Sequence, residues 1–317
     1  MSGFPAKLLL FGEYSILLGS SALSIPLDIF SASLELIGNE AGESKAMALA
    51  SNHQLKILSD HFNSEHVQFA EFLDLKRFND DVNQGLFFAS SIPQRYGMGS
   101  SGALCAAVVA RYRLASDDSN IAGKQIVSDI TRQSLIRMES FFHGRSSGFD
   151  PLVSLLKTPL LSGIDGQITE INSGKVPHGP AGTGILLADT GQPCSTGPLV
   201  NAFLERFAPA GMVSKTGEAF CSLVNATIQN YLAEEHKGFW ENINQLSDFQ
   251  LEHFRHLLPD KFLPIWSAGL RKGLFSMKLC GSGGGGFLLV FTPAMELTMD
   301  YFNRCGIPVT ALPPPVH

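Results

Sequence analysis

The sequence predicts an α+β fold in two domains. Strand-like and helix-like segments alternate along the 317 residues, but without the regular spacing of a doubly wound parallel sheet. The last part, residues 274–312, has two short strands around a glycine run, then a helix and a strand, which is typical of an α+β sandwich. A stretch rich in Gly and Pro at 173–183 is the expected domain boundary. We therefore expect domains at 1–174 and 175–317.

The first domain opens with a predicted strand, turn and strand. Ala6–Leu10 and Ala22–Leu27 are apolar runs of strand length, and Ile16–Leu18 with Gly19-Ser20-Ser21 lies between them. Lys7 within the first run is unusual, because a buried ammonium group must find an anion or lose its proton. The alternative is that Lys7 lies on an exposed edge.

The remaining elements follow from periodicity and breakers. Residues 40–85 are more polar and predict a variable connection with a helix near Asn52–Phe62. Later in this domain we expect strands at Leu86–Ile92, Leu160–Leu161 and Gln167–Ile171, and helices at Ala103–Ala110, Asn120–His143 and Pro151–Leu156. In the second domain we expect strands at Ile185–Ala188, Leu274–Leu279, Phe287–Phe291 and Ile307–Leu312, and helices at 211–233, 238–257, 262–272 and 294–304.

The stretch Pro93–Ala103 is interpreted as a phosphate-binding loop. It joins a strand to a helix of small residues, and glycines let the backbone approach an anion at the helix N-terminus. No lysine follows the glycines, which excludes a Walker A motif, and no βαβ unit frames a dinucleotide site. The alternative is a turn that only caps a core helix. We expect this loop to lie beside the third glycine run, Cys280–Gly286.

Two acidic residues follow the loop. Glu139 stands near the C-terminal end of a predicted helix, where the helix dipole opposes a carboxylate unless a cation is near. Asp150 precedes Pro151 at a predicted helix start, so its alternative role is that of an N-cap alone.

Composition excludes several classes of protein. The formal net charge is −6 and no basic block is present, so nucleic acid is not an expected partner. No apolar run approaches the roughly 18 residues of a membrane span, and no signal peptide is evident at the N-terminus. The five cysteines are scattered, which predicts reduced thiols in a cytoplasmic protein.

Three segments resemble the signature motifs of the GHMP small-molecule kinases, a family that includes galactokinase, homoserine kinase, mevalonate kinase and phosphomevalonate kinase. They are Pro5–Tyr14, Pro93–Ala103 and Lys278–Gly286, and they span nearly the whole chain. The resemblance implies an N-terminal domain like ribosomal protein S5 and a C-terminal ferredoxin-like sandwich. The segment His143–Asp150 looks like the mevalonate kinase sequence His-Gly-x-Pro-Ser-Gly-x-Asp, with Ser146 where proline is usual.

The resemblance also assigns roles. Asp150 would be the general base and Lys7 its charge-stabilising partner, and Ser101 and Glu139 would hold Mg²⁺. ATP would be bound by Pro93, Gly97, Gly99, Ser100, Ser101, Gly102 and Gly283. The small alcohol acceptor, with mevalonate first, would be bound by Glu13, Tyr14, His143, Ser147, Thr196, Gly281 and Ser282. Asp189-Thr190-Gly191 resembles a substrate-side segment, and a homodimer is compatible with the family.

The acceptor has a competing interpretation. Tyr14 follows Glu13 where mevalonate kinases commonly have His, and Gly-Glu-Tyr is common in phosphomevalonate kinases. A phosphorylated acceptor would need further cations, for which Arg95, Arg145 and Lys157 are candidates. A decarboxylase of the same family, or a relative that binds without catalysis, are further alternatives. The joint presence of Lys7, Ser101, Glu139 and Asp150 disfavours the non-catalytic relative.

Overall fold

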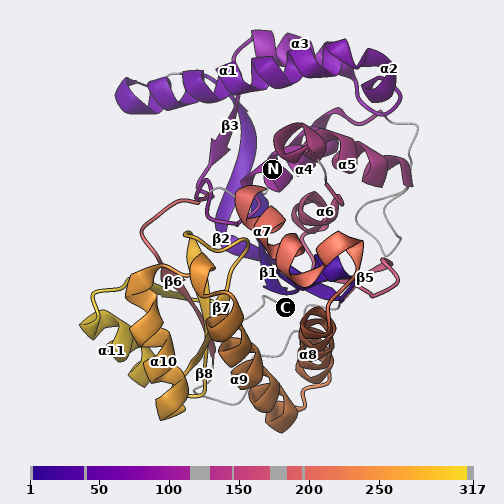
Figure 1. Ribbon diagram of the computed structural model, residues 1–317. Helices are drawn as coiled ribbons and strands as arrows, with labels where there is room; N and C mark the ends of the chain where they lie inside the picture. The colour runs from indigo at the N-terminus through magenta and orange to yellow at the C-terminus, as the bar shows by residue number, and fades with distance from the viewer. Residues whose placement is uncertain are drawn as a thin grey trace. The chain divides into compact units, whose positions relative to one another are not determined.

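Most of the chain is described by the computed structural model (Figure 1). The described residues are 3–38, 41–114, 129–144, 146–171, 184–194 and 197–312. They form two compact units that interleave along the sequence: residues 1–7, 26–93 and 99–157 make the first, and residues 8–25, 94–98 and 158–317 make the second. Most of the expected boundary stretch lies outside the described residues, so the division at residue 174 stays a prediction.

The first unit carries helices on a strand pair. The strand β3 (Leu86–Ser90) runs antiparallel to the end of β2 (Ala22–Leu36), with Ala32 opposite Ser90. The helices are α1 (Gly42–Ser64), α2 (His66–Phe69), α3 (Leu75–Asn83), α4 (Ser100–Tyr112), α5 (Asp129–His143) and α6 (Phe149–Leu156). The helix α1 packs on β3 and α3, and α4 packs between α5 and α6 (Figure 1).

The second unit contains an antiparallel sheet in the order β7-β8-β6-β9. Its strands are β6 (Gly184–Asp189), β7 (Ser276–Leu279), β8 (Phe287–Thr292) and β9 (Val309–Ala311). The strand β8 is buried along its whole length, as a central strand covered on both faces should be. In the same unit β4 (Leu160–Ser162) pairs with the start of β2 and with β5 (Ile168–Glu170).

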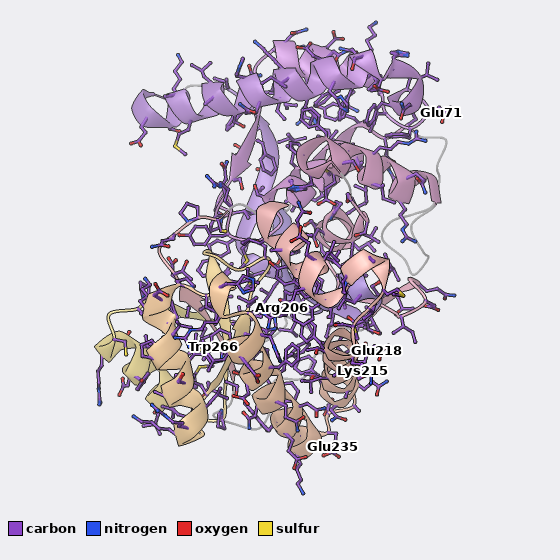
Figure 2. All side chains as sticks on the ribbon, viewed as in Figure 1. Glu71, Arg206, Lys215, Glu218, Glu235 and Trp266 are labelled. Atoms are coloured by element: carbon purple, nitrogen blue, oxygen red, sulfur yellow. The ribbon has the colours of Figure 1, made fainter. Side chains whose placement is uncertain are left out.

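The helices of the second unit are α7 (Gly197–Phe207), α8 (Lys215–Leu232), α9 (His236–His253), α10 (Leu263–Lys272) and α11 (Met295–Arg304). Of these, α9 and α10 pack on β7, α11 contacts β9, and α8 packs on α9. Lys215 and Glu218 mark the start of α8, and Glu235 its turn into α9 (Figure 2). Trp266 of α10 is completely buried and donates from Nε1 to Ser247 Oγ of α9 at 2.8 Å. This bond satisfies the indole where the two helices meet.

The predicted α+β class and most predicted elements are confirmed. The run at Ile16–Leu18 is a turn of 3-10 helix, η1 (Ser15–Leu18), between β1 (Phe4–Phe11) and β2. The helix expected near Asn52–Phe62 is confirmed as part of α1, but the rest of 40–85 is not mainly a connection, because α1, α2 and α3 occupy most of it. The helix α7 was not predicted, and the part of Asn120–His143 before residue 129 lies outside the described residues.

The remaining sequence expectations concern cysteines and membranes. All five cysteines are free thiols. None of the helices in the described ranges is both long and apolar enough to cross a membrane.

Candidate active site

A buried ion pair lies at the centre of the first unit. The Lys7 Nζ on β1 is 2.7 Å from Asp150 Oδ2, and the two side chains are 7% and 33% exposed. The alternative of Lys7 on an exposed edge is therefore wrong. The ammonium group is enclosed, whereas one third of the Asp150 side chain still faces solvent. An acid held by a buried cation and open on one side has the arrangement expected of a general base.

Asp150 stands in the first turn of α6 but does not cap it. The N-cap is Gly148 with φ 72°, and α6 has no side-chain capping hydrogen bond. The interpretation of Asp150 as an N-cap is therefore wrong. A carboxylate in a first turn still interacts favourably with the helix dipole.

Close packing leaves little room for a side chain at two glycines of the predicted phosphate loop. Gly99 is the N-cap of α4 at φ 70°, and a Cβ there would lie 2.5 Å from Lys7 Cγ. A Cβ on Gly102 would lie 3.0 Å from the backbone nitrogen of Pro151. These glycines therefore bring the start of α4 against Lys7 and against the turn that carries Asp150. Their contact with phosphate stays a prediction.

Glu139 is a buried acid close to a second acid. It is 6% exposed, and burial, together with the charge of Asp150, raises its pKa to about 7. The Ser146 hydroxyl donates to Glu139 Oε2 and opposes this shift. A divalent cation would offset the cost of two acids in one region, and carboxylate and hydroxyl oxygens are the ligands that Mg²⁺ prefers. Glu139 therefore fits a magnesium ligand, although none of the described residues form a cluster of three or more His, Cys, Asp or Glu suited to a metal.

Ser101 and His143 contact each other across α4 and α5. Ser101 Oγ lies 2.8 Å from His143 Nε2. Burial lowers the pKa of His143, which favours the neutral ring. If Nε2 of the neutral ring carries no hydrogen, it accepts a hydrogen bond from the Ser101 hydroxyl. The lone pairs of Oγ then remain available. The structure therefore brings together Lys7, Ser101, Glu139, His143 and Asp150 in one unit.

The second unit holds another buried ion pair, between the first and third motifs. Glu13 Oε1 is 2.5 Å from Lys278 Nζ, and the side chains are 2% and 1% exposed. Lys278 also donates to the Leu279 carbonyl at 2.7 Å. The phenol of Tyr14 donates to the Ser282 carbonyl, and burial raises its pKa. The predicted contacts of Glu13 and Tyr14 with an acceptor stay predictions, and both side chains already have protein partners.

The third glycine run packs closely against its neighbours. A Cβ on Gly97 would lie 3.1 Å from the Cys280 carbonyl oxygen, and one on Gly286 would lie 2.9 Å from the Tyr96 backbone. The predicted approach of the two glycine segments is confirmed for these residues. Thr190 Oγ1 donates to the Gly286 carbonyl at 2.6 Å, and Gly283 has φ 72° with a Cβ position 2.9 Å from the Leu257 oxygen.

For several predicted site residues, the structure gives no contact that bears on their proposed roles. Thr196 and Arg145 lie outside the described residues. Pro93, Ser100, Gly281 and Ser282 are half-buried, and Ser147 is exposed. Lys157 lies over the Phe4 ring with Nζ 5.1 Å from its centroid.

Comparison with known proteins finds similarity to small-molecule kinases. The mevalonate kinase of Pyrococcus horikoshii is 26% identical over 317 aligned residues, which cover 93% of this chain and 89% of that protein. A solved L. major mevalonate kinase in complex with R-mevalonate has a TM-score of 0.63 at 16% identity, and covers 100% of this chain and 96% of its own. A solved Streptococcus pneumoniae phosphomevalonate kinase, in complex with phosphomevalonate and AMPPNP, has a TM-score of 0.58 at 14% identity, with 97% and 98% covered. No protein-family model matches the chain.

Over nearly its whole length, the chain is similar to small-molecule kinases of the GHMP family. Two buried features of the chain were missed by sequence reasoning. Lys278 is the partner of Glu13, and Ser146 is the partner of Glu139. The signal for Lys278 was available, because it is a lysine within an apolar strand, as Lys7 is. The Ser146 contact had no sequence signal beyond the replacement of a usual proline.

Proposed function

We propose that this protein transfers the γ-phosphoryl group of ATP to the hydroxyl of mevalonate. The observation that carries the proposal is the Lys7–Asp150 ion pair of 2.7 Å, with its acid one-third exposed, beside the glycines that begin α4. The mevalonate kinase relative that aligns with 93% of the chain supports this acceptor.

In the proposed reaction Asp150 removes the proton of the acceptor hydroxyl. A bond forms between the acceptor oxygen and the γ-phosphorus, and the bond from that phosphorus to the β–γ bridging oxygen of ATP breaks. Lys7 holds the Asp150 carboxylate in place by their ion pair and stabilises negative charge near the reacting oxygen during the transfer. Because phosphoryl transfer needs little covalent chemistry from the protein, the positions of these two charges account for most of their effect.

Ser101 and Glu139 would hold the magnesium ion that accompanies ATP. When bound, Mg²⁺ neutralises charge on the phosphates and fixes their orientation. Glu139 would contribute its charge. Ser101 would contribute an oxygen lone pair while its hydroxyl donates a hydrogen bond to the neutral His143 ring 2.8 Å away.

Phosphomevalonate kinase is the second candidate because of Gly12-Glu13-Tyr14. Three additional cations were considered for binding the phosphate of such an acceptor. Two of them give no support to this candidate, because Lys157 lies over the Phe4 ring and Arg145 is outside the described residues.

An ADP-release assay with separate acceptors decides between the candidates. Purified protein with ATP and Mg²⁺ is offered mevalonate, phosphomevalonate, homoserine or galactose. We expect kcat/KM for mevalonate to exceed that for each other acceptor by at least about 100-fold, since a site that hydrogen-bonds its own substrate rejects analogues strongly. A preference for phosphomevalonate would replace the acceptor but keep the family. If none of the four acceptors increases ADP release above the rate measured without acceptor, the proposal is contradicted.

A further inference from the structure

One hydroxyl group connects α5, which carries Glu139, with the start of α6, which carries Asp150. The Ser146 side chain donates a hydrogen bond to Glu139 Oε2 and accepts one from the backbone N–H of Gly148, 2.9 Å long. A serine hydroxyl has one hydrogen to donate and two lone pairs, so it makes both contacts at once. The half-buried Ser146 therefore bridges a side chain on α5 and the backbone at the start of α6.

The two ends of this bridge belong to different parts of the proposed chemistry. Glu139 is a buried carboxylate in the last turns of α5. Gly148 is the N-cap of α6, which has no side-chain cap of its own, and Asp150 follows in the first turn. Since Gly148 and Asp150 share one tight turn, a bond to the Gly148 N–H restrains the backbone that carries Asp150.

The neighbouring serines show what an ordinary hydroxyl does in this region. Ser147 is exposed, and its hydroxyl accepts a hydrogen bond of 3.3 Å from the Phe149 N–H, two residues on. Ser140 Oγ donates to the Ile136 carbonyl of its own helix at 2.7 Å. Ser146 differs because it reaches a buried carboxylate seven residues away, which loses a partner if the hydroxyl is removed.

We infer that Ser146 is a positioning residue that fixes the Glu139 carboxylate relative to the start of α6, so that a metal ion held by Glu139 is aligned with Asp150. The inference rests on the proposed function for the role of Glu139.

The first test uses the free protein in EDTA, without nucleotide. Amide hydrogen exchange at Gly148 is compared in wild type, Ser146→Ala, Ser146→Thr and the matched control Ser140→Ala. We expect exchange on the order of tenfold faster in Ser146→Ala, because its acceptor is gone, and wild-type exchange in the other two. Unchanged exchange in Ser146→Ala would overturn the bridge itself.

The second test asks whether the bridge matters for the metal. Binding of AMPPNP is measured by calorimetry in Mg²⁺ and in EDTA. We expect Ser146→Ala to lose several-fold of the affinity gained from Mg²⁺ while its affinity in EDTA stays that of wild type, and Ser146→Thr to keep the gain. If wild type gains affinity from Mg²⁺ and Ser146→Ala gains as much, Ser146 has only a structural role and the inference fails. If wild type gains nothing from Mg²⁺, the proposed metal role of Glu139 fails first, and the inference with it.

Discussion

At the scale of single residues, the main features are two ion pairs whose lysines are buried. Two lysines lie in apolar strands, and each has an acid within 2.7 Å: Asp150 for Lys7 and Glu13 for Lys278. Removing charges from water is costly, so such pairs persist only where the geometry is good. The Lys7 pair is partly open to solvent on its acidic side, whereas the Lys278 pair is closed. We therefore propose that the Lys7 pair is the reactive one and that the Lys278 pair, called here the anchoring pair, has a structural role.

The anchoring pair makes a stability prediction. Lys278→Met should leave the buried Glu13 without its cation and cost about 3–5 kcal/mol of unfolding free energy. The double variant with Glu13→Gln should recover most of this loss, because no buried charge remains. Urea unfolding of the single and double variants measures both. A single variant as stable as wild type would contradict the closed ion pair.

Glu139 makes a prediction about pH. Its pKa of about 7 in the folded protein lies above the ordinary value of 4.5, so the folded state binds a proton more tightly than the unfolded chain. Without metal, this group's contribution to stability is present below pH 4.5 and is lost as pH rises through 7. In EDTA, Glu139→Gln should therefore be more stable than wild type at pH 8 and nearly equal to it at pH 4.5.

Denaturant unfolding at the two pH values checks the Glu139 prediction. The matched control is Glu71→Gln, an exposed carboxylate of the same unit (Figure 2), which should follow wild type at both. If Glu139→Gln gains nothing at pH 8, burial does not penalise the Glu139 charge. Magnesium with AMPPNP should reverse the order at pH 8, because wild type alone supplies the charged ligand.

At the scale of elements, close helix packing sets the position of Asp150. The start of α4 approaches the first turn of α6 at Gly102, where even a methyl group would meet the Pro151 backbone at 3.0 Å. Backbone cannot move aside as a flexible side chain can. The small-residue character of α4, which first suggested a phosphate loop, is therefore also a packing requirement.

Gly102→Ala tests this packing. In an open helix the change should stabilise by up to about 1 kcal/mol through propensity. Here we expect a loss of about 1–3 kcal/mol from overpacking, with lower turnover because α6 shifts. The control is Gly238→Ala in α9, where the nearest neighbours of the added Cβ are side-chain atoms of Asn230 and Glu235 rather than backbone. Thermal unfolding and turnover of both variants decide, and equal effects would contradict a special role for Gly102.

At the scale of the whole molecule, the sequence predicted types of element better than their assembly. Strands such as β6 and β8 were found because apolar runs between glycines are distinctive. The helix α1 was underestimated because its exposed polar face hides its length. The two interleaved units could not be predicted, since no local pattern reports that residues 94–98 pack with a segment near residue 280.

The candidate site was predicted by its residue types rather than by its contacts. Lys7 and Asp150 were paired from motif resemblance, and their ion pair agrees with it. The partners of Glu139 and Glu13 were not predicted. Ser146 has no distinctive sequence context, and a lysine in an apolar strand, such as Lys278, indicates that it needs an acid but not which one. Side-chain partnership across distant segments is a property of the folded molecule.

Single-turnover kinetics test the proposed role of Asp150 as the general base. Single-turnover phosphorylation of mevalonate is followed for wild type and Asp150→Asn, with thermal unfolding of both as the control for folding. We predict a fall in rate on the order of 10²–10⁴-fold, since general-base catalysis contributes that much, with both proteins folded at the assay temperature. A folded Asp150→Asn that transfers phosphate at the wild-type rate would contradict the account.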